Sequence, residues 1–141
     1  MKVLNMTPHQ VTVYFINPKT GETERIVNIP PSGEILRLEE EDMETRELTL
    51  DLDDGQQIVV PVKVRKYHLG DLLNKLSQFA GQEVAVIVSS MIIQSLEPQV
   101  FDALRRKGIY LIAPDSSKGA IRNTQGVILG VTGFVTGGNE M

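Results

Sequence analysis

The hydrophobic pattern is clearest between residues 83 and 115, where two largely apolar segments flank an amphipathic one. Residues 83–90 are rich in β-branched side chains, which is typical of a strand buried on both faces. In residues 91–108 the apolar positions recur at helical spacing, basic residues fill the last turn, and Gly108 follows. Residues 109–117 form a second apolar segment that closes at Pro114. A strand, a helix and a strand in succession predict a right-handed βαβ unit with two parallel strands.

Pro98 lies inside the helical pattern, where proline removes a backbone hydrogen-bond donor. It can begin a second helical segment after Glu97 or kink one continuous helix, and we favour two short segments. A further helix is predicted at residues 72–80, because Leu72, Leu76 and Phe79 share one helical face.

The first 68 residues alternate apolar and polar positions with a period of two, which predicts strands joined by tight turns. The clearest hairpin joins residues 48–52 to residues 58–64 across Asp54 and Gly55. The other strands expected in this part of the chain are residues 2–6, 11–15, 25–29 and 35–39.

The C-terminal pattern predicts one more hairpin, in which residues 120–123 pair with residues 127–134. Gly130 and Gly133 indicate a bulge or a close backbone contact in the second strand. The tail at 136–141 has nothing to bury, and we expect it to fray unless a partner holds it.

These elements predict an α+β fold in a single domain over residues 1–141. Residues 1–68 are expected to be mostly β, and residues 69–135 to hold a helix, the βαβ unit and the C-terminal hairpin. We expect antiparallel β-hairpins and one βαβ unit to form a mixed sheet, with the two halves of the chain as two layers.

Composition narrows the classes of function. The chain has 141 residues, 41% hydrophobic and 23% charged, as in ordinary globular proteins. It has no cysteine, which excludes disulfides, thiolate catalysis and cysteine-ligated zinc. No signal-peptide core and no apolar run of about 18 residues occur, so we expect a cytoplasmic protein without a membrane partner. A net charge of −4 argues against direct nucleic-acid binding.

No phosphate-binding glycine loop, HExxH motif or histidine–cysteine zinc spacing occurs, and we expect no cofactor and no metal. Ligands of parallel strand–helix units bind beyond the carboxyl ends of the strands. The candidate ligand-binding residues there are His9, Ser89, Ser90, Asp115 and Arg122. The alternatives are a serine helix cap and simple turns. A Ser-His-Asp triad would rest on proximity alone, so we assign no catalytic residue and favour a binding protein over an enzyme.

An acidic run precedes the clearest hairpin, and three further aspartates, Asp51, Asp53 and Asp54, follow it. The run consists of Glu39, Glu40, Glu41, Asp42 and Glu44. It is either a solvated edge or a candidate interface for a protein with a basic surface, since opposite charges attract and speed association.

Five short motifs occur in this chain in the same order as in a known group of proteins. They are Asn5-Met6-Thr7-Pro8-His9, Pro30-Pro31-Ser32-Gly33, Ile87-Val88-Ser89, Pro114-Asp115 and the stretch from Arg122 to Gly130. With them the chain resembles an uncharacterised group of small phage and prophage proteins. It departs from that group at residues 69–82, where a helix is expected in place of a proline-rich loop.

The resemblance implies a phage context and no particular chemistry. Small acidic phage proteins often bind a host machine, so our first hypothesis is a non-enzymatic regulator that binds host RNA polymerase and modulates transcription in the host cytoplasm. The alternatives are a protein that binds or hydrolyses a small nucleotide signal, as in anti-defence, and a homo-oligomeric structural or assembly protein. The sequence leaves the partner's identity, the binding surface and the oligomeric state open.

Overall fold

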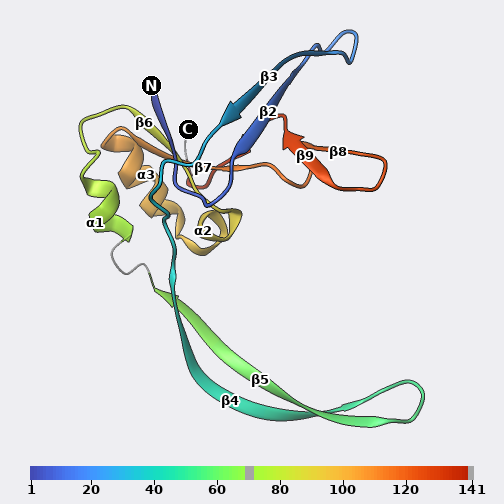
Figure 1. The fold of residues 1–141 in the computed structure, drawn as a ribbon. Coiled ribbons are helices and arrows are strands. Elements are labelled where there is room, and N and C mark those ends of the chain that lie inside the picture. The colour runs from blue at the N-terminus through green and yellow to red at the C-terminus, as the bar shows by residue number, and fades with distance from the viewer. Residues whose placement is uncertain (69–71, 140–141) are drawn as a thin grey trace.

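A computed structural model of the protein describes residues 1–68 and 72–139 (Figure 1). The elements follow in this order: β1 (Lys2–Asn5), β2 (Val11–Ile16), β3 (Thr23–Ile29), β4 (Glu39–Asp51), β5 (Gln57–His68), α1 (Leu72–Ser77), β6 (Val84–Ile87), α2 (Ser90–Ser95), α3 (Pro98–Arg106), β7 (Ile109–Pro114), β8 (Ala120–Arg122), β9 (Ile128–Val131) and β10 (Phe134–Val135).

The central sheet has the strand order β1-β6-β7-β10. β6 and β7 are adjacent and parallel, with Val86 opposite Leu111, which confirms the predicted βαβ unit. The crossover between them consists of two short helices, and Pro98 stands at the start of the second, as predicted. β1 is also parallel to β6, whereas β10 is antiparallel to β7. The fold is therefore α+β with a mixed sheet.

A second sheet, β3-β2-β9-β8, joins the N-terminal hairpin to the C-terminal one. β2 and β9 meet in parallel at Val13 and Val131. The expectation that the two halves of the chain form two layers is wrong, because each of these sheets contains strands from both halves. The predicted strand at 127–134 is divided, since β9 ends at Val131 and Phe134 belongs to β10, which pairs with β7.

The central sheet is covered on both faces, which accounts for the continuous apolar runs in the sequence. Val84 and Val86 of β6 pack with side chains of the three helices. Ile87, which points to the opposite face, packs with Val11, Val13 and other residues of the second sheet. Successive residues of a strand point to opposite faces, so a strand between two layers needs apolar side chains at every position.

β4 and β5 form a separate two-stranded sheet that projects away from the rest of the molecule (Figure 1). We call residues 39–68 the arm and the remaining described residues the body. Leu48 lies opposite Val60 and Leu50 opposite Ile58, which confirms the predicted hairpin. The pairing continues well beyond the predicted strands, from the turn down to Glu39 and His68.

Three further expectations need correction. The chain at 35–38 is not a strand, although Leu36 is buried and its N–H donates to the carbonyl oxygen of Met6 at 3.0 Å. The helix expected over 72–80 ends at Ser77 and continues as turns. Residues 136–139 do not fray, because the Thr136 hydroxyl donates to the Leu111 carbonyl oxygen at 2.6 Å and the Asn139 N–H donates to Asp102 at 3.1 Å.

Candidate functional site

The loop after β1 is held by a buried asparagine. Asn5 is 1% exposed, the only polar side chain that is buried within residues 1–68 and 72–139. Its amide nitrogen donates to the carbonyl oxygens of His9 at 2.8 Å and Ile29 at 3.0 Å. Its amide oxygen accepts from the N–H of Thr7 at 3.1 Å and from the Thr7 hydroxyl at 2.6 Å. Thr7, Pro8 and His9 are thus fixed as a loop at the carboxyl end of β1.

The carboxyl ends of β1, β6 and β7 lie side by side because these strands are parallel. The loops that leave these ends, together with residues of β2 and β9, line a cavity of about 440 Å³, which we call the large cavity. Its lining consists of Thr7, Pro8, His9, Gln10, Val11, Thr12, Val88, Ser89, Pro114, Ser116 and residues 128–131.

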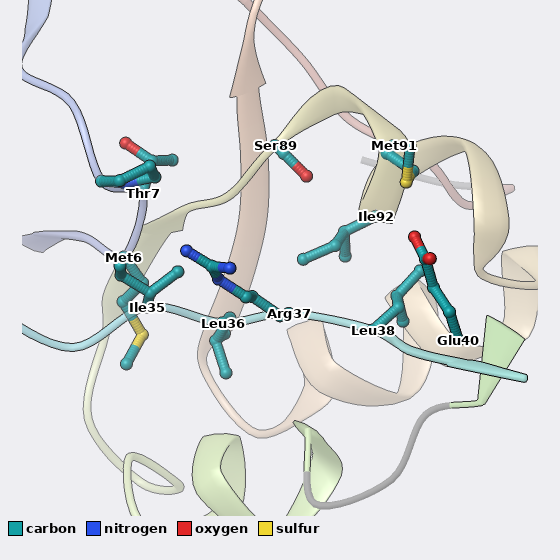
Figure 2. Close-up of a pocket in the computed structure, with 11 residues that line it drawn as sticks. Met6, Thr7, Ile35, Leu36, Arg37, Leu38, Glu40, Ser89, Met91 and Ile92 are labelled. Atoms are coloured by element: carbon teal, nitrogen blue, oxygen red, sulfur yellow. The ribbon is translucent and has the colours of Figure 1, made fainter.

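A smaller cavity of about 240 Å³ adjoins the large one, and the two share Thr7, Pro8 and Ser89 in their linings. Figure 2 shows Arg37 extending into the space between Met6 and Ser89, and the Ser89 side chain pointing into the same space. Most of the remaining lining is apolar. Its other members are Met6, Ile35, Leu36, Leu38, Glu40, Met91 and Ile92.

Two of the predicted ligand-binding residues, His9 and Ser89, meet at the large cavity. Ser89 occupies the N-cap position of α2, but its hydroxyl makes no capping hydrogen bond. A capping role therefore does not account for this side chain. Ser90 is the first residue of α2 and is not part of either lining.

Asp115 and Arg122 are engaged within their own loop. Burial raises the pKa of Asp115, but hydrogen bonds from the Ser117 hydroxyl and from backbone N–H groups lower it by more, so the net shift is downward. Arg122 donates to the carbonyl oxygens of Gly126 at 2.8 Å and Ser116 at 3.4 Å. Neither residue lines the large cavity, so the structure brings together only part of the predicted set.

The arm has one apolar face that no residue within 1–68 and 72–139 covers. The register places Leu48 with Val60 and Leu50 with Ile58. Val62 and Val64 lie farther down on the same face, opposite Arg46 and Glu44. Leu48, Leu50 and Ile58 are between 38% and 48% exposed, as are Leu52, Val62 and Val64. In ordinary antiparallel sheets the apolar face packs on a core, whereas here it faces solvent.

The acidic run forms the first part of β4, and β5 supplies basic partners across the hairpin. Arg65 lies 2.8 Å from Asp42 and 3.7 Å from Glu40, and His68 lies 2.7 Å from Glu41. The hydrogen bond from Arg65 lowers the pKa of Asp42, and the same contact raises the pKa of Arg65. The repulsion expected within the run is thus partly offset.

The charge is distributed unevenly between the arm and the rest of the chain. Residues 39–68 contain nine acidic and four basic side chains, a net charge of −5. The rest of the chain contains nine acidic and ten basic side chains, a net charge of +1. At the tip of the arm, Asp51, Asp53 and Asp54 form no ion pair with any residue that the structure describes. The arm therefore carries the acidity of the whole protein.

Comparisons with protein-family models, with curated protein sequences and with solved structures found no match. Among residues 1–68 and 72–139, no group of three or more histidine, aspartate or glutamate side chains is arranged to hold a metal ion. In the same residues, no helix is both long enough and apolar enough to cross a bilayer.

Sequence reasoning missed two features of these surfaces. Arg37 lies within the strand expected at residues 35–39, a segment that is irregular in the structure, and it belongs to no motif, so nothing marked it as a cavity residue. The alternation of the arm strands was visible, but alternation predicts one apolar face without saying whether a core covers it. No local signal marks the full length of the arm, with strands of 13 and 12 residues, because residues 39–47 do not alternate between apolar and polar positions.

Proposed function

We propose that this protein is a non-enzymatic binding protein whose arm docks on another protein. The observation that carries the proposal is the uncovered apolar face of the arm, centred on Leu48, Leu50, Ile58 and Val62. An isolated two-stranded hairpin is marginally stable in water, so a hairpin of this length gains from a surface that covers it. Exposed apolar faces of this kind mark interaction sites.

The free energy gained by covering this face can be estimated from the burial of its side chains. Full burial of a leucine, isoleucine or valine side chain contributes about 1.5–3 kcal/mol. The six half-exposed residues of the arm face are already partly buried. Each would therefore contribute only roughly 1 kcal/mol on docking. The sum is sufficient for a specific complex once part of it has offset the entropy lost on association.

The charge of the arm indicates which kind of surface the partner has. It favours a protein with an apolar strip flanked by basic residues. A net charge of −5 on the arm attracts such a surface and repels an acidic one. Proteins that handle nucleic acid have basic surfaces of this kind. Together with the resemblance to phage proteins, this supports host RNA polymerase in the host cytoplasm as the specific partner, and modulation of transcription as the outcome.

Binding of purified host RNA polymerase to two matched variants tests the proposal. Leu50→Asn places an amide on the apolar face, and Thr49→Asn places the same group on the opposite face of the same strand. We expect Leu50→Asn to weaken binding about tenfold, which corresponds to roughly 1.4 kcal/mol, and Thr49→Asn to have little effect.

Light scattering of the free protein completes the test. A stable dimer or larger oligomer that Leu50→Asn dissociates would mean that a second copy covers the face, as in an assembly protein. A monomer that does not bind the polymerase, or one whose binding Leu50→Asn leaves intact, would defeat the proposal of the arm as its docking surface.

A further inference from the structure

We propose that the two adjoining cavities at the carboxyl ends of β1, β6 and β7 bind a small nucleotide. This site is separate from the arm face and does not depend on the proposed function. Ligands of parallel strand–helix folds bind at this edge of the sheet, where several loops converge. The loops that carry Thr7, Ser89 and Ser116 converge here.

The smaller cavity supplies the groups that recognise an anion. Arg37 lines it and makes no hydrogen bond or ion pair with any described residue, so its five N–H donors are available. The Ser89 hydroxyl makes no capping hydrogen bond and points into the same space (Figure 2). A guanidinium fork and a hydroxyl together match a phosphate group, which accepts several hydrogen bonds at once. Glu40 also lines this cavity, and Arg65, which pairs with Asp42 at 2.8 Å, lies 3.7 Å from the Glu40 carboxylate and offsets part of its charge.

The large cavity supplies an apolar space for the body of the ligand. Its volume of about 440 Å³ falls in the range of small-molecule sites. Pro8, Val88, Pro114 and Leu129 line it, and these side chains suit the flat face of a base. His9 also lines it, and its ring makes no hydrogen bond to any described residue, which leaves a polar group to meet a sugar hydroxyl or a base edge.

The shape of the large cavity is preformed. Asn5 holds the Thr7–Pro8–His9 loop with three hydrogen bonds and ties it to Ile29 of β3 with a fourth, and this loop contributes to both linings. On the other side Gly130 lets β9 approach β2 closely. A methyl group at Gly130 would lie 2.5 Å from Tyr14 Cε2 and 2.6 Å from the Thr12 carbonyl oxygen. A site that is already formed loses little entropy when a ligand binds.

Thermal shift and calorimetric titration of the full chain test the site. The probes are mono-, di- and cyclic nucleotides, the matching nucleosides, and inorganic phosphate. We expect at least one nucleotide to raise the unfolding midpoint, and the nucleoside and phosphate to bind at least tenfold more weakly, because each occupies only one of the two cavities.

Variants assign the binding to these residues. Arg37→Gln and Ser89→Ala should each weaken binding of that nucleotide about tenfold, whereas Arg106→Gln, which changes an exposed arginine of α3, should not. Leu50→Asn should bind the nucleotide as the unchanged chain does, which separates this test from that of the arm. Absence of binding across the panel would overturn the proposal. So would a nucleotide affinity that Arg37→Gln and Ser89→Ala leave unchanged, or inorganic phosphate binding as tightly as the nucleotide.

Discussion

At the scale of single residues, Asn5 has the most defined role in the molecule. It is buried at the end of β1, and its side chain serves both as donor and as acceptor for the loop that follows. Buried polar groups without partners are costly, so a side chain that satisfies several backbone groups at once determines a single loop conformation.

Asn5→Ala should lower the free energy of unfolding by about 2–4 kcal/mol, because it leaves the Ile29 carbonyl oxygen and the Thr7 N–H without their Asn5 partner and removes one of the two hydrogen bonds to the His9 carbonyl oxygen. Urea denaturation measures the change. Asn28→Ala is the matched control, since Asn28 is exposed and accepts one hydrogen bond, from the Thr12 hydroxyl at 2.9 Å. Equal losses in the two variants would contradict a special role for Asn5.

Ser89 illustrates why a residue type can mislead at this scale. A serine between a strand and a helix predicts an N-cap, and Ser89 does occupy that position. Its hydroxyl nevertheless makes no cap, and it points toward the cavity that Arg37 also enters (Figure 2). The position follows from local sequence, whereas the direction of the side chain depends on what packs around it.

At the scale of elements, the arm differs from every other hairpin in the described part of the chain. The β2-β3 hairpin continues into a sheet and buries Val11 and Val13. The arm strands pair only with each other, and none of their residues belongs to the hydrophobic core. Its cross-strand ion pairs are exposed, and pairs of that kind contribute little to stability.

Shortening the arm should leave the body folded. In a variant whose residues 44–64 are replaced by an Asn-Gly turn, we expect the midpoint of thermal unfolding to change by less than about 4 °C, because no core contact is lost. Circular dichroism measures the midpoint. A much larger fall would mean that the arm supports the body and is not an independent element.

At the scale of the whole molecule, the separation of charge is the dominant feature. The arm carries −5 and the rest of the chain +1, so the field of the protein points along the arm. Charges at the base of the arm are partly paired across its strands, whereas Asp53 and Asp54 at the tip have no ion-pair partner within residues 1–68 and 72–139.

Reversing the charge at the tip should slow association with a basic partner. We expect Asp53→Lys with Asp54→Lys to lower the on-rate at low salt about tenfold and to flatten its salt dependence. Stopped-flow or biosensor kinetics with the polymerase at two salt concentrations measures both quantities. Glu22→Lys with Glu34→Lys changes the net charge equally, but on the body, and should have a smaller effect. Equal effects of the two pairs would mean that net charge alone steers the encounter.

The sequence by itself determined the elements whose signals are local. Continuous apolar runs predicted β6 and β7, Pro98 predicted the division of the crossover helix, and alternation across Asp54 and Gly55 predicted the core of the arm. Each of these follows from backbone geometry or from side-chain period within a few residues, so no knowledge of distant contacts was needed. His9 and Ser89 were found as candidate residues for the same reason, because each follows a strand end.

Only the tertiary structure decided which strands became neighbours and which surfaces stayed uncovered. That β1 lies beside β6, that Val13 meets Val131, and that Phe134 leaves β9 for a strand beside β7 are pairings between segments far apart in the chain. The period of the side-chain pattern does not determine which apolar strands pair, because each possible pairing offers a similar gain in burial. For the same reason the sequence did not predict that Arg37 lies beside Ser89. It also did not predict the uncovered apolar face of the arm, since a pattern indicates which side of a strand is apolar but not what lies against it.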